Sequence, residues 1–348
     1  MDPNQPNQPS PSTIMQIGTG FWASKVLLAA IHFELFTQLA ERGAMSAPAI
    51  KSMLNFNCID RHVYDFLDIL TGFGFLKREG LLENAKYSNG TDTEVFLNKG
   101  LPSYIGGILE MLNNRLYRFW GDLENGLRTG QPQNEAKGGV EDPFKELYKT
   151  PEALSEFIQA MSGIQKGNFM TFARKFDFSP YKTLTDAGGA GANLCIAVAK
   201  EHPHMACTCF DLPAVNPIAS LNIKLADLND RVKSVSGNFF EDPIPSADII
   251  VMGNILHDWD ENKKMDLVQK AYDALPENGV FVAIENVIDE DRRQNIFGMM
   301  MSLNMLIETG KGFDYTFSDF KSWAEKAGFK RTELVPLAGP SSAAIAYK

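Results

Sequence analysis

The fold is decided by one glycine-rich stretch, Thr185-Asp186-Ala187-Gly188-Gly189-Ala190-Gly191-Ala192-Asn193. Residues 181–184 before it have the pattern of a short strand, and residues 194–200 after it have the pattern of a helix with one apolar face. Glycines at such a junction let the backbone turn sharply and approach a ligand, because no Cβ is in the way. Turns of this kind are common, so the stretch alone is a weak signal of ligand binding. It predicts the opening unit of a nucleotide-binding α/β sheet.

Strands and helices alternate after this unit, which predicts a Rossmann-like, mostly parallel sheet covered by helices on both faces. The further strands expected in it cover residues 205–210, 248–253 and 280–284. The helices expected between and after them span residues 261–275 and 295–308. An antiparallel pair at the sheet edge is expected from residues 330–335 and 343–347.

The N-terminal part has a different, mostly helical pattern. Apolar residues recur at helical spacing over residues 14–39, with Gly43 as a stop signal. Ser46 is expected to cap a short helix, and Asp60 to cap a second one. A turn at residues 79–80 between strand-like flanks completes a winged-helix domain.

A winged helix raises the alternative of a DNA-binding regulator. The helix that would enter a groove carries more acidic than basic side chains, namely Asp60, Asp65 and Asp68 against Arg61. Such a helix would repel phosphates, so a packing or dimerisation module is favoured. The strongly apolar first helix also suggests that a partner chain covers it. We therefore expect a homodimer formed through this domain.

The predicted domains are residues 1–102, a winged-helix-like dimerisation domain with a disordered start over residues 1–12, and residues 103–348, the α/β domain. The second includes linking helices to about residue 178, interrupted by a solvent loop at residues 131–142. A net charge of -10 and a pI of about 5.1 argue against nucleic acid or an anionic membrane as a partner. No apolar run approaches a membrane span and no signal peptide is evident, which predicts a cytoplasmic protein.

Four cysteines in a chain of 348 residues do not make a disulfide framework. Cys207 and Cys209 alternate along a predicted strand and so face the same side, but no matching pair of ligands exists elsewhere. Buried thiols are therefore favoured over a metal site.

Polar residues follow four predicted strands at one edge of the sheet. These are the glycine-rich stretch, Asp211, the segment 254–257 and Glu285. Ligands of open α/β sheets bind at this edge. A carboxylate at Asp211 can accept hydrogen bonds from both ribose hydroxyls of a nucleotide; the alternative is that it caps a helix starting at residue 212.

The glycine turn favours one class of nucleotide ligand over another. Its order is Asp-x-Gly-Gly-x-Gly, with the Asp186 carboxylate before the glycines, rather than the Gly-x-Gly-x-x-Gly of NAD sites. A carboxylate there would repel a pyrophosphate but accept hydrogen bonds from an ammonium group. This favours S-adenosylmethionine, with NAD as the alternative.

His257 lies just after a strand end, where it is suited to take a proton near neutral pH. Glu285 either holds the imidazole in one tautomer or is a solvated strand end. His202 and His204 lie in a helix-to-strand connection away from this edge and are expected to be structural.

With these residues in view, nearly the whole chain resembles the small-molecule O-methyltransferases of the caffeate, acetylserotonin and antibiotic-tailoring type. The motifs that carry the resemblance are Asp186-Ala187-Gly188-Gly189-Ala190-Gly191, His202-Pro203-His204, Phe210-Asp211-Leu212-Pro213, Gly237-Asn238-Phe239-Phe240 and Leu256-His257-Asp258-Trp259. The resemblance implies a dimer through the N-terminal domain and S-adenosylmethionine, released as S-adenosylhomocysteine, in the C-terminal one. It also implies that His257 is the general base, oriented by Glu285.

The predicted site has three sets of residues. The catalytic set is His257, Glu285 and Asp314. The cofactor-binding set is Asp186, Gly188, Gly189, Asp211, Leu212, Gly237, Asn238, Phe239, Asn254 and Trp259. The set lining the acceptor pocket is Phe157, Met161, Met300, Met301 and Asn304. No metal is expected.

The chain departs from the family pattern at two places. Asn238 stands where the family usually has Asp, so the adenine amino group would meet an amide oxygen. Asp314-Tyr315-Thr316 stands where the family has Glu-Arg-Thr, so Asp314 takes the place of a longer acid.

The reaction expected is methyl transfer from S-adenosylmethionine to a hydroxyl of an aromatic small molecule, in secondary metabolism. His257 takes the proton as the oxygen attacks. Some relatives keep the fold and cofactor but catalyse hydroxylation, decarboxylation or pericyclic reactions, which is the alternative; the presence of His257 argues against it.

Overall fold

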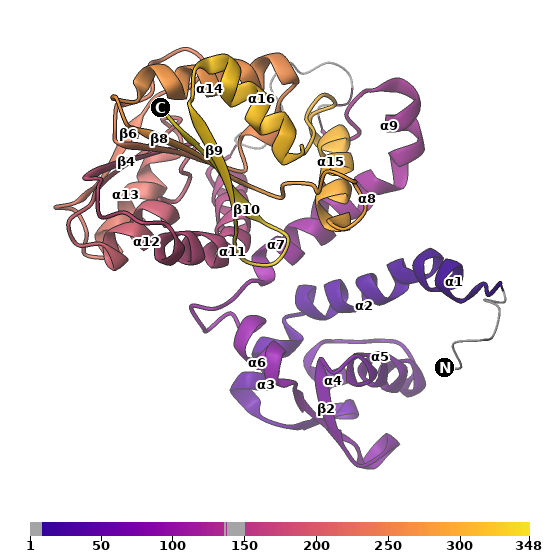
Figure 1. Cartoon of the computed structure of the whole chain (residues 1–348). Helices are drawn as coiled ribbons and strands as arrows, with labels where there is room; N and C mark the ends of the chain where they lie inside the picture. Colours follow the sequence, from indigo (N-terminus) through magenta and orange to yellow (C-terminus); the bar gives the residue numbers. More distant parts are fainter. Residues whose placement is uncertain (1–8, 136, 138–149) are drawn as a thin grey trace, which may run out of the picture. The chain divides into compact units, whose positions relative to one another are not determined.

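The computed structural model describes residues 9–135, 137 and 150–348. The chain folds into two compact units, Met1–Asn114 and Arg115–Lys348, and each is described by itself (Figure 1). The boundary expected after residue 102 falls inside the first of these units. Residues 1–8 of the predicted disordered start, and residues 136 and 138–142 of the predicted loop, lie outside the described residues.

The N-terminal unit contains the helices and hairpin of a winged helix. Its helices are α1 (Ser12–Gly18), α2 (Gly20–His32), α3 (Leu35–Arg42), α4 (Ala47–Met53), α5 (Asp60–Gly72), α6 (Thr91–Phe96) and α7 (Gly106–Met111). One antiparallel sheet has the order β1 (Met45–Ser46), β3 (Lys86–Asn89) and β2 (Leu76–Glu79). These elements bury a common apolar core that includes Phe36, Ile50, Leu67 and Tyr87.

The prediction of one helix over residues 14–39 is wrong, because the helix is interrupted twice. The first break is at Thr19, between α1 and α2. The second is at Glu34, whose φ of 55° puts it in the left-handed region between α2 and α3. A right-handed helix cannot continue through that conformation. The predicted stop at Gly43 is confirmed, since α3 ends there.

The two predicted helix caps have different outcomes. Ser46 caps α4 as predicted, and its hydroxyl accepts the backbone N–H of Ala49 at 3.4 Å. Asp60 does not cap α5; Ile59 holds that position, and the Asp60 carboxylate pairs with Lys51 Nζ at 2.7 Å. A carboxylate in the first turn still stabilises the helix through the helix dipole.

The predicted hairpin forms with a longer connection than expected. β2 ends at Glu79, and Gly80 adopts a φ of 81°, which favours glycine. The second strand begins only at Lys86, because a 3-10 turn, Leu82–Asn84, fills the connection. The strand-like flank expected directly after residue 80 is therefore wrong.

Large apolar side chains are exposed on α1 and the start of α2. We call this surface the α1–α2 face; its residues, all more than half exposed, are Ile14, Met15, Ile17, Phe21 and Trp22. The segment Ser12–His32 has 21 residues and a mean hydropathy of 1.4 in its most apolar window, so by length and composition it passes as a membrane span. The expectation that no apolar run approaches that length is wrong for this segment. Apolar patches of this kind on soluble proteins mark surfaces that another molecule covers.

The C-terminal unit is built on a seven-stranded sheet with the order β6-β5-β4-β7-β8-β10-β9. The strands in that order are Val232–Ser236, Ala206–Asp211, Thr183–Ala187, Ile249–Gly253, Val280–Glu285, Ser342–Tyr347 and Arg331–Pro336. The first five are parallel, and β10 runs antiparallel to both neighbours. The predicted strands and the antiparallel edge pair are confirmed, except that the first strand, expected over residues 181–184, lies at Thr183–Ala187. β6 was not predicted.

Helices cover both faces of this sheet, as predicted (Figure 1). They are α11 (Pro151–Lys175), α12 (Asn193–Glu201), α13 (Asn216–Leu225), α14 (Glu261–Ala274) and α16 (Phe317–Ala327). A further helix, α15 (Ile296–Glu308), packs instead against α9 (Leu123–Thr129). Successive side chains of a strand point to opposite faces. Ile249 and Val251 accordingly join the core on the side of α12, whereas Ile250 and Met252 join the core on the side of α14.

The thiols are where the sequence predicted them. Cys207 and Cys209 face the same side of the sheet and lie in one core with Cys195, and all three are buried and free.

Candidate active site

The glycine-rich loop after β4 is packed so closely that side chains would not fit at its glycines. Gly188 has a φ of 82°, and a Cβ added to it would lie 2.3 Å from Cδ1 of Ile255. A Cβ on Gly189 would lie 2.8 Å from Oδ2 of Asp186. The loop therefore brings bare backbone beside a buried carboxyl group at the carboxyl end of the sheet.

Asp211 is fixed at the end of β5, facing this loop. Its Oδ2 accepts the backbone N–H of Ala190 at 2.8 Å, and its Oδ1 accepts the N–H of Leu212 at 2.7 Å. The alternative of a cap for a helix at residue 212 is wrong, because α13 begins at Asn216. Each oxygen keeps a lone pair for a further donor, such as a ribose hydroxyl.

Asp186 is a buried carboxyl group directly below the glycines. Burial, helped by the nearby charge of Asp211, raises its pKa from 3.8 to about 8. A cationic ligand placed beside it would favour the ionised form. Together with the fixed Asp211 carboxylate and the bare backbone of the loop, this set of acceptors fits a nucleoside that carries an ammonium group, as S-adenosylmethionine does.

Aromatic rings form a wall beside the loop after β6. The Phe239 and Phe240 rings lie 4.8 Å apart, and the Phe240 ring lies 4.6 Å from that of Trp259. The loop is held by Asn238, whose Oδ1 accepts the N–H of Phe240 at 3.0 Å. Gly237 lies against Phe210, where a Cβ would approach a ring carbon to 2.3 Å.

His257 lies after β7 in a short 3-10 helix, Leu256–Asp258, and its ring is buried. Nδ1 is 3.4 Å from an oxygen of Asp314, and Nε2 is 3.6 Å from an oxygen of Asp258. Burial lowers the pKa of the imidazole, but the charges of Asp314 and Asp258, with a smaller effect of Glu285, outweigh burial and raise it to about 10. The ring is thus held between carboxylates that increase its affinity for a proton.

Asn254 lies at the start of this segment and has a φ of 52°, and its N–H donates to the Ile284 carbonyl at 3.1 Å.

Asp314 reaches the imidazole in spite of its short side chain. Its backbone N–H donates to the Ser302 hydroxyl at 3.2 Å, which ties it to α15. Gly312, two residues earlier, lies so near the His257 segment that a Cβ would approach the His257 carbonyl oxygen to 2.5 Å. This close packing shortens the distance that the Asp side chain must span.

Glu285 supports His257 through the main chain. It is the last residue of β8 and is 1% exposed, so the alternative of a solvated strand end is wrong. Its Oε1 accepts the backbone N–H groups of Ile255 at 3.1 Å and of His257 at 3.2 Å. These bonds run to the backbone of the 3-10 helix, whereas the carboxylate that faces Nδ1 of the ring is that of Asp314.

α15, which carries three of the predicted acceptor residues, packs against the 3-10 helix of His257. Asn304 is half-buried, and its Oδ1 accepts the indole N–H of Trp120 at 2.9 Å. Its Nδ2 lies 3.9 Å from the sulfur of Met301. Met300 is 49% exposed. Trp120 belongs to a 3-10 turn, Trp120–Asp122, and was not predicted as a site residue.

The other two predicted acceptor residues, Phe157 and Met161, are half-buried on α11. This helix packs on the cofactor loop, since Leu154 and Ile158 share a cluster with Ala190 and Leu212. The cluster does not include Phe157 or Met161, so their place beside the cofactor and the acceptor stays a prediction. His202 and His204 are structural as expected, since each Nε2 bonds a backbone carbonyl, at 2.6 and 3.1 Å.

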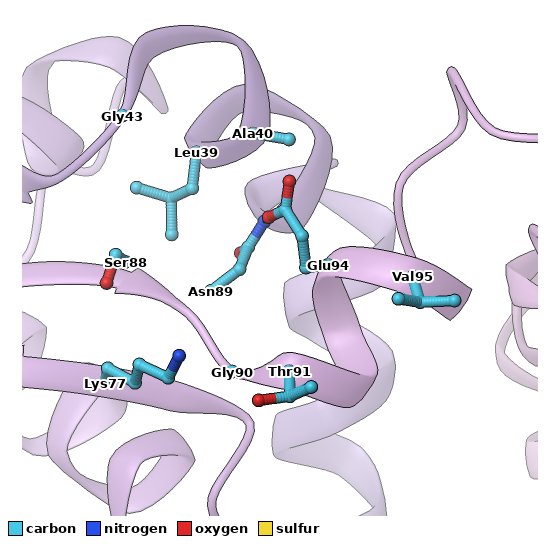
Figure 2. A pocket seen from close by; sticks show the side chains of 10 residues that line it. All are labelled: Leu39, Ala40, Gly43, Lys77, Ser88, Asn89, Gly90, Thr91, Glu94 and Val95. Atoms are coloured by element: carbon cyan, nitrogen blue, oxygen red, sulfur yellow. The ribbon is translucent and has the colours of Figure 1, made fainter.

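A cavity in the N-terminal unit is separate from these residues. It has a volume of about 460 Å³ and lies between α3, the β2–β3 hairpin and α6 (Figure 2). Figure 2 shows Asn89 and Glu94 side by side in it, and Asn89 Nδ2 donates to Glu94 Oε2 at 2.7 Å. None of the predicted site residues lines this cavity.

Comparisons with known proteins point to one family. The model of the O-methyltransferase domain matches residues 120–330, and that of the O-methyltransferase dimerisation domain matches residues 15–99. The tetracenomycin polyketide synthesis 8-O-methyl transferase TcmO of Streptomyces glaucescens is 32% identical over 338 residues, which cover 97% of each chain. Acetylserotonin O-methyltransferase of Homo sapiens is 29% identical over 314 residues, covering 89% of this chain and 90% of the relative.

Solved structures agree with the sequence matches. The crystal structure of human N-acetylserotonin methyltransferase in complex with SAM has a TM-score of 0.90 and 27% identity, and covers 100% of this chain and 99% of that one. PigF with SAH has a TM-score of 0.85 and 25% identity, with coverage of 98% and 100%. The resemblance seen in the motifs is confirmed: the chain belongs to the O-methyltransferase family and is an S-adenosylmethionine-dependent O-methyltransferase.

Proposed function

We propose that this enzyme methylates a hydroxyl group of an aromatic small molecule in secondary metabolism, with His257 as general base. The observation that carries the proposal is the buried imidazole of His257 between Asp314 and Asp258. It follows β7, one strand away from the glycine loop after β4. A proton acceptor beside a methyl donor is what O-methylation of a weakly acidic hydroxyl requires.

S-adenosylmethionine, when bound, supplies an already activated methyl group. This chain's own residues bind and orient it: Asp211 accepts from the ribose, Asp186 faces the ammonium end, and the Asn238–Phe239 segment flanks the adenine. Gly188, Gly189 and Gly237 let the backbone of the two loops pack closely beside it, and Leu212, Asn254 and Trp259 complete the cofactor set.

Proton removal is the second task of the site. A phenol has a pKa of about 10, so at pH 7 about one molecule in a thousand is ionised in water. The raised pKa leaves a minor fraction of His257 neutral at pH 7, and this form accepts the proton at Nε2 while Asp314 stabilises the imidazolium from Nδ1. General-base catalysis of this kind contributes roughly 10²–10⁴-fold. Glu285 acts as a positioning residue that fixes the backbone on which the imidazole is mounted.

The acceptor pocket is proposed to be flat and apolar with a few polar groups. Met161, Met300 and Met301 suit an aromatic face because thioethers are polarisable and adaptable. Phe157 adds a ring, and Asn304 adds an amide whose orientation Trp120 fixes. The relatives TcmO and 3-hydroxy-5-methyl-1-naphthoate 3-O-methyltransferase carry aromatic or polyketide acceptors in their names, which supports an aromatic substrate here.

We further propose a homodimer formed through the N-terminal domain, residues 1–102, and a cytoplasmic location. The α1–α2 face and the match to a dimerisation domain support the dimer. The catalytic domain would then be residues 103–348. No metal is required by the proposed chemistry.

The experiment is transfer of labelled methyl from S-adenosylmethionine to a panel of phenols and hydroxylated polycyclic aromatics, with calorimetry of cofactor binding. Transfer that His257→Ala abolishes is the expected result. Transfer to a nitrogen acceptor alone would contradict O-methylation; one relative, OxyT of Streptomyces rimosus, is named an N,N-dimethyltransferase. Cofactor binding with hydroxylation, decarboxylation or rearrangement of the test compound would favour the diverged reactions instead.

A further inference from the structure

We propose that Lys264, a buried lysine outside the predicted site, is a positioning residue that links the cofactor wall to the base and supplies a cation to the carboxylates around His257. The inference rests on the proposed function of His257. Lys264 lies in the first turns of α14 and is 0% exposed. Lysine side chains are almost never fully buried without specific partners.

The ammonium group of Lys264 has two partners from different segments of the chain. Its Nζ donates a hydrogen bond to the backbone carbonyl of Trp259. It also lies 3.3 Å from the centroid of the Phe313 ring. A cation over an aromatic face, removed from water, is a favourable contact. One ammonium group therefore joins two residues, Trp259 and Phe313, that are 54 positions apart in the sequence.

Each of these partners adjoins a residue of the proposed machinery. Trp259 packs its ring on Phe240 in the aromatic wall. Phe313 directly precedes Asp314, whose carboxylate lies 3.4 Å from Nδ1 of His257. A shift of either segment would therefore change the position of the cofactor wall relative to the base. Misplacement of reacting groups by about 1 Å can cost 10²-fold in rate.

The charge of Lys264 acts on the same cluster. Asp258, Glu285 and Asp314 interact electrostatically with it, and Asp260 does so from its own helix. The groups that face His257 itself are Asp258, Asp314 and Glu285. Tyr315 adjoins Glu285, and Glu308 of α15 acts on Asp258. Burial lowers the pKa of Lys264 to about 8, so the group remains mostly cationic at neutral pH.

Removing this cation has a predictable sign. Without it, the carboxylates around His257 are less well compensated, and the imidazole holds its proton more strongly. Because the base must be neutral to act, the acid limb of kcat/KM against pH should then move to higher pH. A lysine that only fills space would leave that limb unchanged.

The test compares Lys264→Met, which keeps an unbranched chain one atom shorter but removes charge and donor, with Lys264→Gln, which keeps a donor. Lys326→Met on the surface of α16 is the matched control. We expect Lys264→Met to lower kcat by about tenfold or more. The acid limb should move up by about one pH unit in both Lys264 variants, and S-adenosylhomocysteine binding should change less than about threefold. Lys264→Gln should retain more of kcat.

Several results would overturn the proposal. One is a wild-type pH profile in both Lys264 variants, and another is a loss confined to cofactor affinity. A third is failure of both variants to fold, because the lysine would then be purely structural. Failure of the proposed function itself is distinguishable, because the wild-type enzyme would then transfer no methyl group to any hydroxyl.

Discussion

The Asp314 carboxylate lies 3.4 Å from Nδ1 of His257. The acid that faces this ring nitrogen therefore comes from a loop 57 positions further along the chain. Glu285, which the motif resemblance assigned to this role, bonds the backbone N–H of His257 at 3.2 Å. Asp314 and Glu285 therefore support the imidazole in different ways, in addition to Asp258 near Nε2. Asp314 acts on the ring and Glu285 on the main chain.

Replacing His257 by Ala should reduce methyl transfer by 10²-fold or more, because the hydroxyl would lose its proton acceptor. S-adenosylhomocysteine binding, measured by calorimetry, should stay near normal, since the cofactor residues are untouched. Asp211→Ala is the matched comparison and should weaken that binding. Unchanged turnover in His257→Ala would remove this residue from the mechanism.

Asp314→Asn should shift the pH dependence of activity in a defined direction. The charge of Asp314 is a main cause of the raised pKa of His257, about 10. Its removal lowers that pKa, so neutral His257 persists to lower pH and the acid limb of kcat/KM should move down. Maximal kcat should fall by about tenfold, since a weaker and less oriented base remains. A limb that does not move would show that Asp314 does not act on the imidazole.

Asp186→Asn should stabilise the enzyme without ligand while weakening cofactor binding. Burial raises the folded-state pKa of Asp186 from its ordinary value of 3.8 to about 8. The wild-type residue therefore contributes stability at low pH that is lost as the pH rises through this interval. At pH 8 the variant should unfold with a free energy about 1–3 kcal/mol larger than that of the wild type. Urea titrations at pH 5 and pH 8 measure this; equal differences at both pH values would contradict it.

Trp120→Phe should affect the acceptor and not the cofactor. The indole N–H donates to Asn304 at 2.9 Å, and phenylalanine keeps the ring but lacks the donor. Without this bond the Asn304 amide is no longer held in one orientation, so the KM of the acceptor should rise by about fivefold to tenfold, as expected for one lost hydrogen bond. Steady-state kinetics with each substrate varied in turn separate the two effects. An equal rise in the KM of S-adenosylmethionine would argue against a local role.

Phe21→Ser with Trp22→Ser should weaken the proposed dimer. These side chains are 55% and 63% exposed on the α1–α2 face. Burial of such rings contributes roughly 1.5–3 kcal/mol each, so the dissociation constant should rise by at least about tenfold. Analytical ultracentrifugation over a dilution series measures it. Leu225→Ser, which removes an exposed apolar side chain from α13, is the control.

Much of the fold could be predicted from local patterns, but some elements could not. Buried strands such as Val280–Glu285 are apolar throughout and easy to recognise. β6, Val232–Ser236, is an edge strand with one buried residue, so it lacks that signal. The break at Glu34 also leaves no local mark, because the residue there is not a glycine.

The site was predictable where motifs carry it and less so where tertiary packing decides. His257 and Asp211 lie at strand ends, which sequence pattern can locate. The contact of Asp314 with the imidazole depends on how Gly312 packs on the His257 segment, and the contact of Trp120 with Asn304 joins residues from separate helical segments. Lys264 looks like an ordinary surface residue in the sequence, since its burial arises only when α14 meets Phe313.

The position of β10 has a consequence for synthesis in the cell. β10 follows β9 in the chain, yet it lies between β8 and β9 in the sheet. Until β10 inserts, β9 has no strand to pair with and the edge of β8 stays open. Open strand edges invite pairing between chains. This side of the sheet is therefore completed only when the last strand inserts, and a chain that has not yet placed β10 should depend most on chaperones.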